Sequence, residues 1–274
     1  MAGPDRPSRG DAMEILSGFG FLTLFGLSAL AGIALRMWLP EEHLSKENME
    51  AVRLVTGLLV TFAALVLSLQ LSTARSAFDS ANRNRSLYAA ELARLDQCLR
   101  NLGPNLAPTR QILSRYVAAV IASTWPAEPA PSVAGMPDTR RMSVRGEDAV
   151  LAGMLNEVGL AIDTTAPAPD LSPVLQRCRA DYARVQESRW AVIEDTNGPQ
   201  SGLFLGIISF WLALVFLSFG LQVPRRRVSG IVLAIGVVSV ASVMFVIVDL
   251  ALPYQGLFGI RSLAMREALA DMSR

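Results

Sequence analysis

The chain has few of the residues that usually support catalysis or metal binding. Its 274 residues include one histidine, His43, and two cysteines. A histidine-based metal site or a catalytic triad therefore lacks its components, and two cysteines alone do not hold a zinc ion. The patterns GxxxxGK(S/T), HExxH and GxSxG do not occur in the sequence. We therefore expect a protein that is not an enzyme and that carries no cofactor or metal.

Charged residues are also scarce, at 18% of the chain, while 51% of the residues are hydrophobic. The net charge of +1 gives no general attraction for nucleic acid, and the only notable basic run is Arg225, Arg226 and Arg227. Nucleic acid is therefore not an expected partner. The charges are concentrated outside four long apolar stretches, a pattern typical of an integral membrane protein with one soluble domain.

Each apolar stretch is about long enough to cross a bilayer. The stretches run over residues 15–34, 54–71, 203–221 and 228–248, and a helix needs about 20 apolar residues to span roughly 30 Å of hydrocarbon. The first contains Ala29-Leu30-Ala31, which resembles a signal-peptide cleavage site. It is long for a signal core, however, and continues to Trp38. We therefore predict four spanning helices, with the first left uncleaved.

The short loops predict how these helices are oriented in the membrane. With four spans, the run 225–227 lies on the same face as Arg36, Lys46 and Arg53. Short loops rich in arginine and lysine stay in the cytoplasm, so this face is predicted to be cytoplasmic. The polar middle of the chain and both termini would then lie outside, and the bilayer would be a bacterial inner membrane with a periplasmic domain.

The two cysteines lie at matching distances from the apolar stretches. Cys98 follows the second stretch by about 26 residues, and Cys178 precedes the third by about 25. If both flanking segments are helices, each thiol lies roughly 38 Å from the membrane at about 1.5 Å per residue. A disulfide is then feasible, and an even cysteine count fits an oxidising compartment. The alternative is that each cysteine is a small buried hydrophobe.

The polar middle predicts helices separated by proline-rich segments. Apolar residues at alternating steps of four and three predict that a helix continues through residues 74–101, followed by helices at 108–124, 146–161 and 171–195. We predict a tail at 1–14, a transmembrane hairpin at 15–72, an extracytoplasmic helical domain at 73–200 with a flexible loop at 127–145, a second hairpin at 201–252 and a C-terminal interfacial segment at 253–274. The predicted fold class is therefore all-α, with four transmembrane helices and a helical domain inserted between the second and third.

A line of small and weakly polar residues follows the second span at helical spacing. It consists of Gly57, Thr61, Ala64, Ser68 and Ser72. Such a stripe permits close contact between helices, or it lines a narrow aqueous path in an oligomer. Gly202 with Gly206, and Gly230 with Ala234, are interpreted first as packing faces.

Asp249 is an acid near the end of the fourth apolar stretch, where a carboxylate is costly unless it is paired or hydrated. It is either part of an ion pathway or a carboxylate satisfied at the membrane interface. Arg75, Arg83 and Arg85 are possible partners or vestibule charges, although such a run usually marks a solvated helix face.

Several segments resemble one family of bacterial four-span proteins of unknown function, labelled bestrophin-like. They are residues 39–44, 52–57 and 74–79, the pair Trp125-Pro126, and residues 249–257. The label implies, by analogy alone, a homo-oligomeric anion channel. We therefore expect a self-associating, channel-like membrane protein. The alternative is a membrane-anchored periplasmic scaffold or sensor without a pore.

Overall fold

The computed structural model describes residues 9–40, 45–140, 142, 146–197, 202–223, 227–254 and 257–274. All regular structure in these residues is helical, which confirms the predicted fold class. The chain divides into two compact units. We call Met1–Ser76 with Pro199–Ala251 the membrane unit, and Ala77–Gly198 with Leu252–Arg274 the helical unit.

Within the described part of the chain, four helices are long and apolar enough to cross a membrane, as the sequence predicted. They are α1 (Arg9–Trp38), α2 (Lys46–Asn101), α6 (Gly202–Gln222) and α7 (Arg227–Leu250). Helix α1 begins within the segment that was predicted to be a tail. The loop that holds His43 lies outside the described residues.

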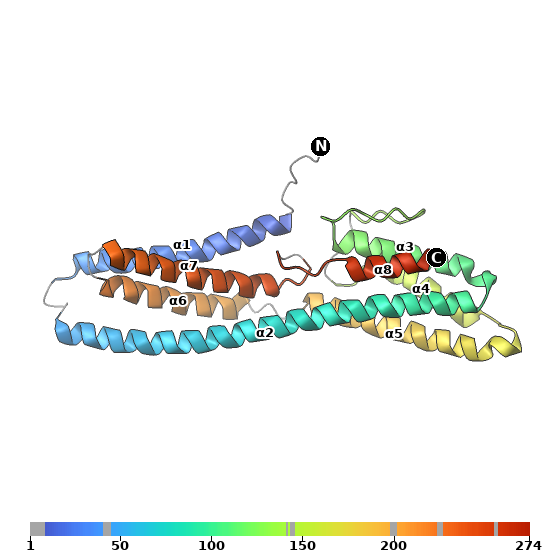
Figure 1. Cartoon of the computed structure of the whole chain (residues 1–274), viewed down its shortest axis with the longest axis horizontal. Coiled ribbons are helices and arrows are strands. Elements are labelled where there is room, and N and C mark those ends of the chain that lie inside the picture. Colours follow the sequence, from blue (N-terminus) through green and yellow to red (C-terminus); the bar gives the residue numbers. More distant parts are fainter. Residues whose placement is uncertain are drawn as a thin grey trace, which may run out of the picture. The chain divides into compact units, whose positions relative to one another are not determined.

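In the membrane unit, α1 packs along α6 and α7 (Figure 1). The buried rings of Phe25 and Phe216 stack between α1 and α6 with centroids 5.3 Å apart. At one end, the Arg36 guanidinium donates to the carbonyl oxygens of Leu221, at 3.3 Å, and Val223, at 2.9 Å. These carbonyls belong to the last turn of α6 and the residue after it, where helical partners are missing.

Two glycines allow α1 and α6 to approach each other closely. A methyl group added at Gly32 would overlap the carbonyl oxygen of Leu217, and one added at Gly220 would overlap that of Ala29. The glycines predicted to pack, Gly202, Gly206 and Gly230, have open space at the same position within the described chain. The spacing of small residues is therefore a poor guide here, because tertiary packing decides which face of a helix meets its neighbour.

The helical unit begins with the C-terminal part of α2. Gly103, with φ of 108°, ends that helix in a conformation that favours glycine. The chain continues through η2 (Pro104–Leu106), α3 (Ala107–Thr124), α4 (Ala149–Thr164), η3 (Pro169–Leu171) and α5 (Ser172–Asn197) (Figure 1). These bounds agree with the predicted helices to within a few residues. The described residues between α3 and α4 form turns and irregular chain.

The core of the helical unit is built from buried apolar side chains of α2, α3, α4 and α5. Tyr88, Leu92, Leu95 and Leu99 project from α2 at alternating steps of three and four, and all are at most 2% exposed. This is the spacing that predicted the helix, so the apolar face identified from the sequence is the face that is buried.

The C-terminal segment, predicted to be a separate interfacial segment, belongs to this core. Helix α8 (Leu263–Met272) buries Met265, Ala268 and Met272 against the other helices. The indole nitrogen of Trp125 donates to the carbonyl oxygen of Ile260 at 2.6 Å. A ten-residue helix with three apolar anchors suits a membrane surface or a protein core equally well, so the sequence alone did not discriminate between them.

Candidate functional site

Cys98 and Cys178 are joined within the helical unit. Their Cα atoms are 5.5 Å apart, and their sulfur atoms are at bonding distance. Both side chains are also buried, at 4% and 0% exposure. The two alternatives drawn from the sequence therefore coexist, since the cysteines form a pair and also fill the core.

The predicted stripe on α2 lies on the exposed side of this helix. Gly57, Thr61, Ala64, Ser68 and Ser72 are all exposed in the single chain. Another side of α2 contacts α6, where Thr56 accepts a hydrogen bond from the amide of Gln222 at 2.8 Å. The stripe therefore makes no packing face within the described residues of one chain.

Asp249 lies near the C-terminal end of α7 and is 2% exposed. A carboxylate with so little exposure does not face an open aqueous path within the single chain. The residues predicted to set topology are only partly described: Arg225 and Arg226 lie outside the described residues, and Arg227 begins α7.

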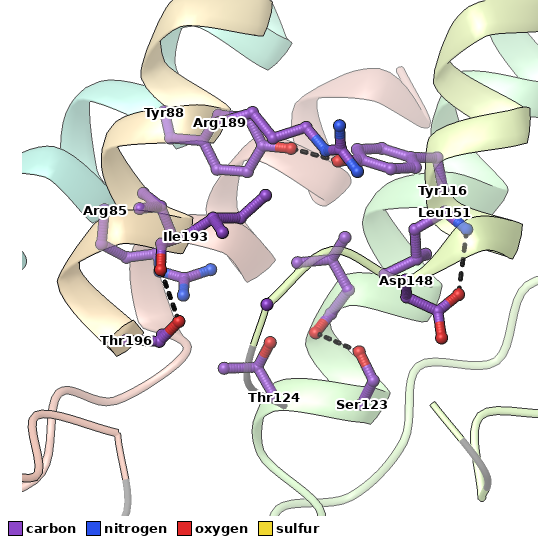
Figure 2. Close-up of a pocket in the computed structure, with 13 residues that line it drawn as sticks. Arg85, Tyr88, Tyr116, Ser123, Thr124, Asp148, Leu151, Arg189, Ile193 and Thr196 are labelled. Carbon is purple, nitrogen blue, oxygen red and sulfur yellow. Dashed lines mark hydrogen bonds between the residues drawn. The ribbon is translucent and has the colours of Figure 1, made fainter. Parts of the chain in front are cut away.

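A pocket of about 60 Å³ opens in the helical unit, at a place the sequence analysis did not identify. Helices α2, α3 and α5 and the start of α4 each contribute to its wall (Figure 2). Its polar lining includes two guanidinium groups, of Arg85 and Arg189, and the phenols of Tyr88 and Tyr116. Each of these four side chains is nearly fully buried.

The two phenols are hydrogen-bonded to each other (Figure 2). Burial raises the pKa of the Tyr116 phenol and raises that of Tyr88 well above its ordinary value. Both groups are therefore neutral hydroxyls at physiological pH. Arg189, 6% exposed, lies beside this pair and donates to a carboxylate oxygen of Glu147 at 3.0 Å.

Arg85 is held between two aromatic rings. Its guanidinium carbon lies 4.7 Å from the ring centroid of Trp125 and 4.5 Å from that of Tyr254. Stacking of this kind favours a cation, with an effect of about 2 kcal/mol for a desolvated pair. Trp125 and Tyr254 also meet edge to face, with centroids 6.2 Å apart. The stack fixes the position of the guanidinium at the pocket.

A family comparison identifies the wider group of proteins. The model of the Bestrophin-like domain matches residues 22–265, which is most of the chain. The chain belongs to the Bestrophin-like family.

One solved structure supports the fold of this Bestrophin-like protein. A crystal structure described as that of a membrane protein covers 94% of this chain over 99% of its own length, with a TM-score of 0.65. The two sequences are 13% identical, so the likeness concerns the fold. No curated protein matches this chain.

The sequence did contain a signal for the pocket of this Bestrophin-like protein. Arg85 lies three residues before Tyr88, and this step continues the apolar series of α2 toward the N-terminus. Of the two interpretations of Arg85, a partner or vestibule charge and a solvated face, the second is wrong, since this residue is 3% exposed. An arginine in register with a buried face is a candidate for a buried, paired or ligand-binding cation.

Proposed function

We propose that this Bestrophin-like protein forms a homo-oligomeric, channel-like assembly, with the stripe of α2 turned toward neighbouring copies and the central axis. The observation that carries the proposal is the exposure of all five stripe residues in the single chain. From Gly57 to Ser72 the stripe extends over roughly 22 Å at about 1.5 Å per residue, which is most of the hydrocarbon thickness.

A second line of residues on α2 supports the proposal that one face of this helix contacts neighbouring copies and another face contacts lipid. This line consists of large apolar side chains that are also exposed, namely Leu54, Leu58, Phe62, Leu65 and Leu69. Lipid tails accommodate such side chains well, whereas glycine and hydroxyl groups gain nothing from lipid and favour close helix contact or water. Contact between copies through the stripe leaves the leucine line to the lipid.

The proposed location is the bacterial inner membrane, with the helical unit in the periplasm. The paired cysteines support an oxidising compartment. The arginine-rich segment before α7 supports a cytoplasmic position for the opposite face. The family label suggests anions as the permeating ions by analogy alone.

Matched cysteine variants of the full-length protein test this arrangement. Ser68→Cys places a thiol on the stripe, and Ser239→Cys places one at an exposed serine of α7. In reconstituted membranes, mild oxidation should cross-link the Ser68→Cys variant between copies. A thiol reagent should also reduce the current of this variant in planar bilayers. The Ser239→Cys variant should show neither effect.

Absence of conductance above that of empty bilayers would contradict the channel. Equal cross-linking at positions 68 and 239 would contradict the role of the stripe. The second candidate function is a membrane-anchored sensor without a pore, and the polar pocket of the helical unit favours it. Cross-linking at position 68 without any conductance would support this candidate.

A further inference from the structure

Arg85 is a buried cation whose hydrogen-bonding capacity is not fully used by the protein. Its side chain is 3% exposed, and its Nε has no hydrogen-bond partner among the described residues. The guanidinium carries five N–H donors and no acceptor. A buried donor without an acceptor is destabilising, and the aromatic stack offsets the loss of hydration only in part. The Arg85 side chain also lines the pocket, so an anionic acceptor in the pocket would stabilise the guanidinium charge.

The acidic groups around the pocket are largely engaged elsewhere. Glu147 accepts from Arg189, and Asp148 accepts from the backbone N–H groups of Val150, at 2.9 Å, and Leu151, at 3.2 Å. Asp195 accepts from the Asn84 amide at 2.9 Å. Burial raises the pKa of the Asp195 carboxyl, and the Asn84 hydrogen bond and the Arg85 charge reverse this only in part. No carboxylate of the described residues is hydrogen-bonded to the Nε of Arg85.

The volume of the pocket limits the size of its occupant. A cavity needs about 10–15 Å³ to hold one water molecule, so the 60 Å³ pocket holds a molecule of roughly four to six non-hydrogen atoms. Part of its wall is apolar, formed by Val120, Leu151, Val192 and Ile193. The pocket therefore presents donors on one side and hydrocarbon on the other.

We propose that this pocket binds a short-chain carboxylate, of the size of acetate or propionate, through the guanidinium of Arg85. The planar guanidinium matches a carboxylate in geometry and charge. The neutral Tyr88–Tyr116 pair supplies a further hydroxyl, and the apolar wall accepts the alkyl group. This inference rests on the helical unit alone and holds whether or not the protein conducts ions.

Saturation-transfer NMR on the purified full-length protein in detergent tests the proposal with propionate as the probe. The methyl protons of propionate should receive saturation from the protein and not from empty micelles. A ligand this small is expected to bind with a dissociation constant no lower than roughly 10 µM. Acetate should displace propionate at similar concentrations, and inorganic phosphate should require higher ones at equal ionic strength.

Two arginine variants of the same helix provide the matched comparison. Arg85→Met should weaken propionate binding by at least about tenfold, because a charge-assisted hydrogen bond is lost. Arg94→Met should leave binding unchanged, since Arg94 is exposed on α2 and pairs with Glu91. If Arg85→Met does not fold, Tyr116→Phe keeps the ring, removes one hydroxyl and should weaken binding by roughly threefold to tenfold.

The proposal is overturned if the wild-type protein shows no transfer above empty micelles. It is also overturned if Arg85→Met and Tyr116→Phe both bind propionate as well as Arg94→Met does. Displacement of propionate by phosphate at lower concentrations than acetate would overturn the carboxylate assignment.

Discussion

Removal of the disulfide should destabilise the helical unit specifically. The bond joins residues separated by 80 positions in the sequence. In the loop-closure description, a loop of this size restricts the unfolded chain by about 4.5 kcal/mol at 25 °C. The helical unit is also attached to membrane helices at Ala77 and Gly198, and this tether already restricts its unfolded chain. We therefore expect a loss of between about 2 and 4.5 kcal/mol.

Hydrogen exchange of the full-length protein in detergent measures this loss within one unit. The buried amides of α3, such as those of Val117 and Ile121, exchange when the helical unit opens. On reduction, or in the double variant Cys98→Ala with Cys178→Ala, their exchange should accelerate by between about 30-fold and about two-thousandfold. The amides of α6 in the membrane unit should not change.

Two controls separate the disulfide from other effects. Reductant should have no influence on the double variant, which has no cysteines left. Mass spectrometry should show that the wild-type bond is reduced under the conditions used. If reduced wild-type protein exchanges its α3 amides less than about threefold faster than the oxidised form, the loop-closure reasoning is refuted.

Three further predictions concern single side chains. Gly220→Leu should lower the thermal stability of the protein in detergent, because the new side chain overlaps α1, whereas Gly230→Leu, which enters open space, should not. Asp96→Asn should cost the helical unit about 1.5–3 kcal/mol in denaturant unfolding, because it weakens the charge-assisted hydrogen bonds that buried Asp96 accepts from Arg110, at 2.8 and 3.0 Å, and from Arg100, at 3.2 Å; an effect below about 0.5 kcal/mol would contradict this prediction. Burial would raise the pKa of the Glu128 carboxyl, but hydrogen bonds from Ser262 and Arg266 lower it overall. The stability that the ionised Glu128 carboxylate adds to the folded protein is therefore fully present above pH 4.5, which is the ordinary pKa of this group. It is lost as the pH falls through the lower pKa that the group has in the folded protein. Glu128→Gln should remove this pH dependence from the exchange of α8 amides.

The candidate pocket illustrates what could be predicted for single residues. The spacing of Arg85 and Tyr88 places both on the buried face of α2, so the burial of this arginine was available from the sequence. Its position between Trp125 and Tyr254 was not available, since these rings come from segments far apart along the chain. No local pattern specifies which aromatic rings meet a given cation across such separations.

The sequence by itself determined the all-helical fold, the four spans and the continuation of the second span into the helical unit. Each of these depends on hydrophobic length and helical periodicity, which are properties of one continuous segment. Tertiary structure decided that Gly32 and Gly220 meet, that α8 joins the core, and that Arg85 and Arg189 line one pocket. These features depend on which faces of distant helices pack together, and that choice is made by the combined shape and burial of all the helices.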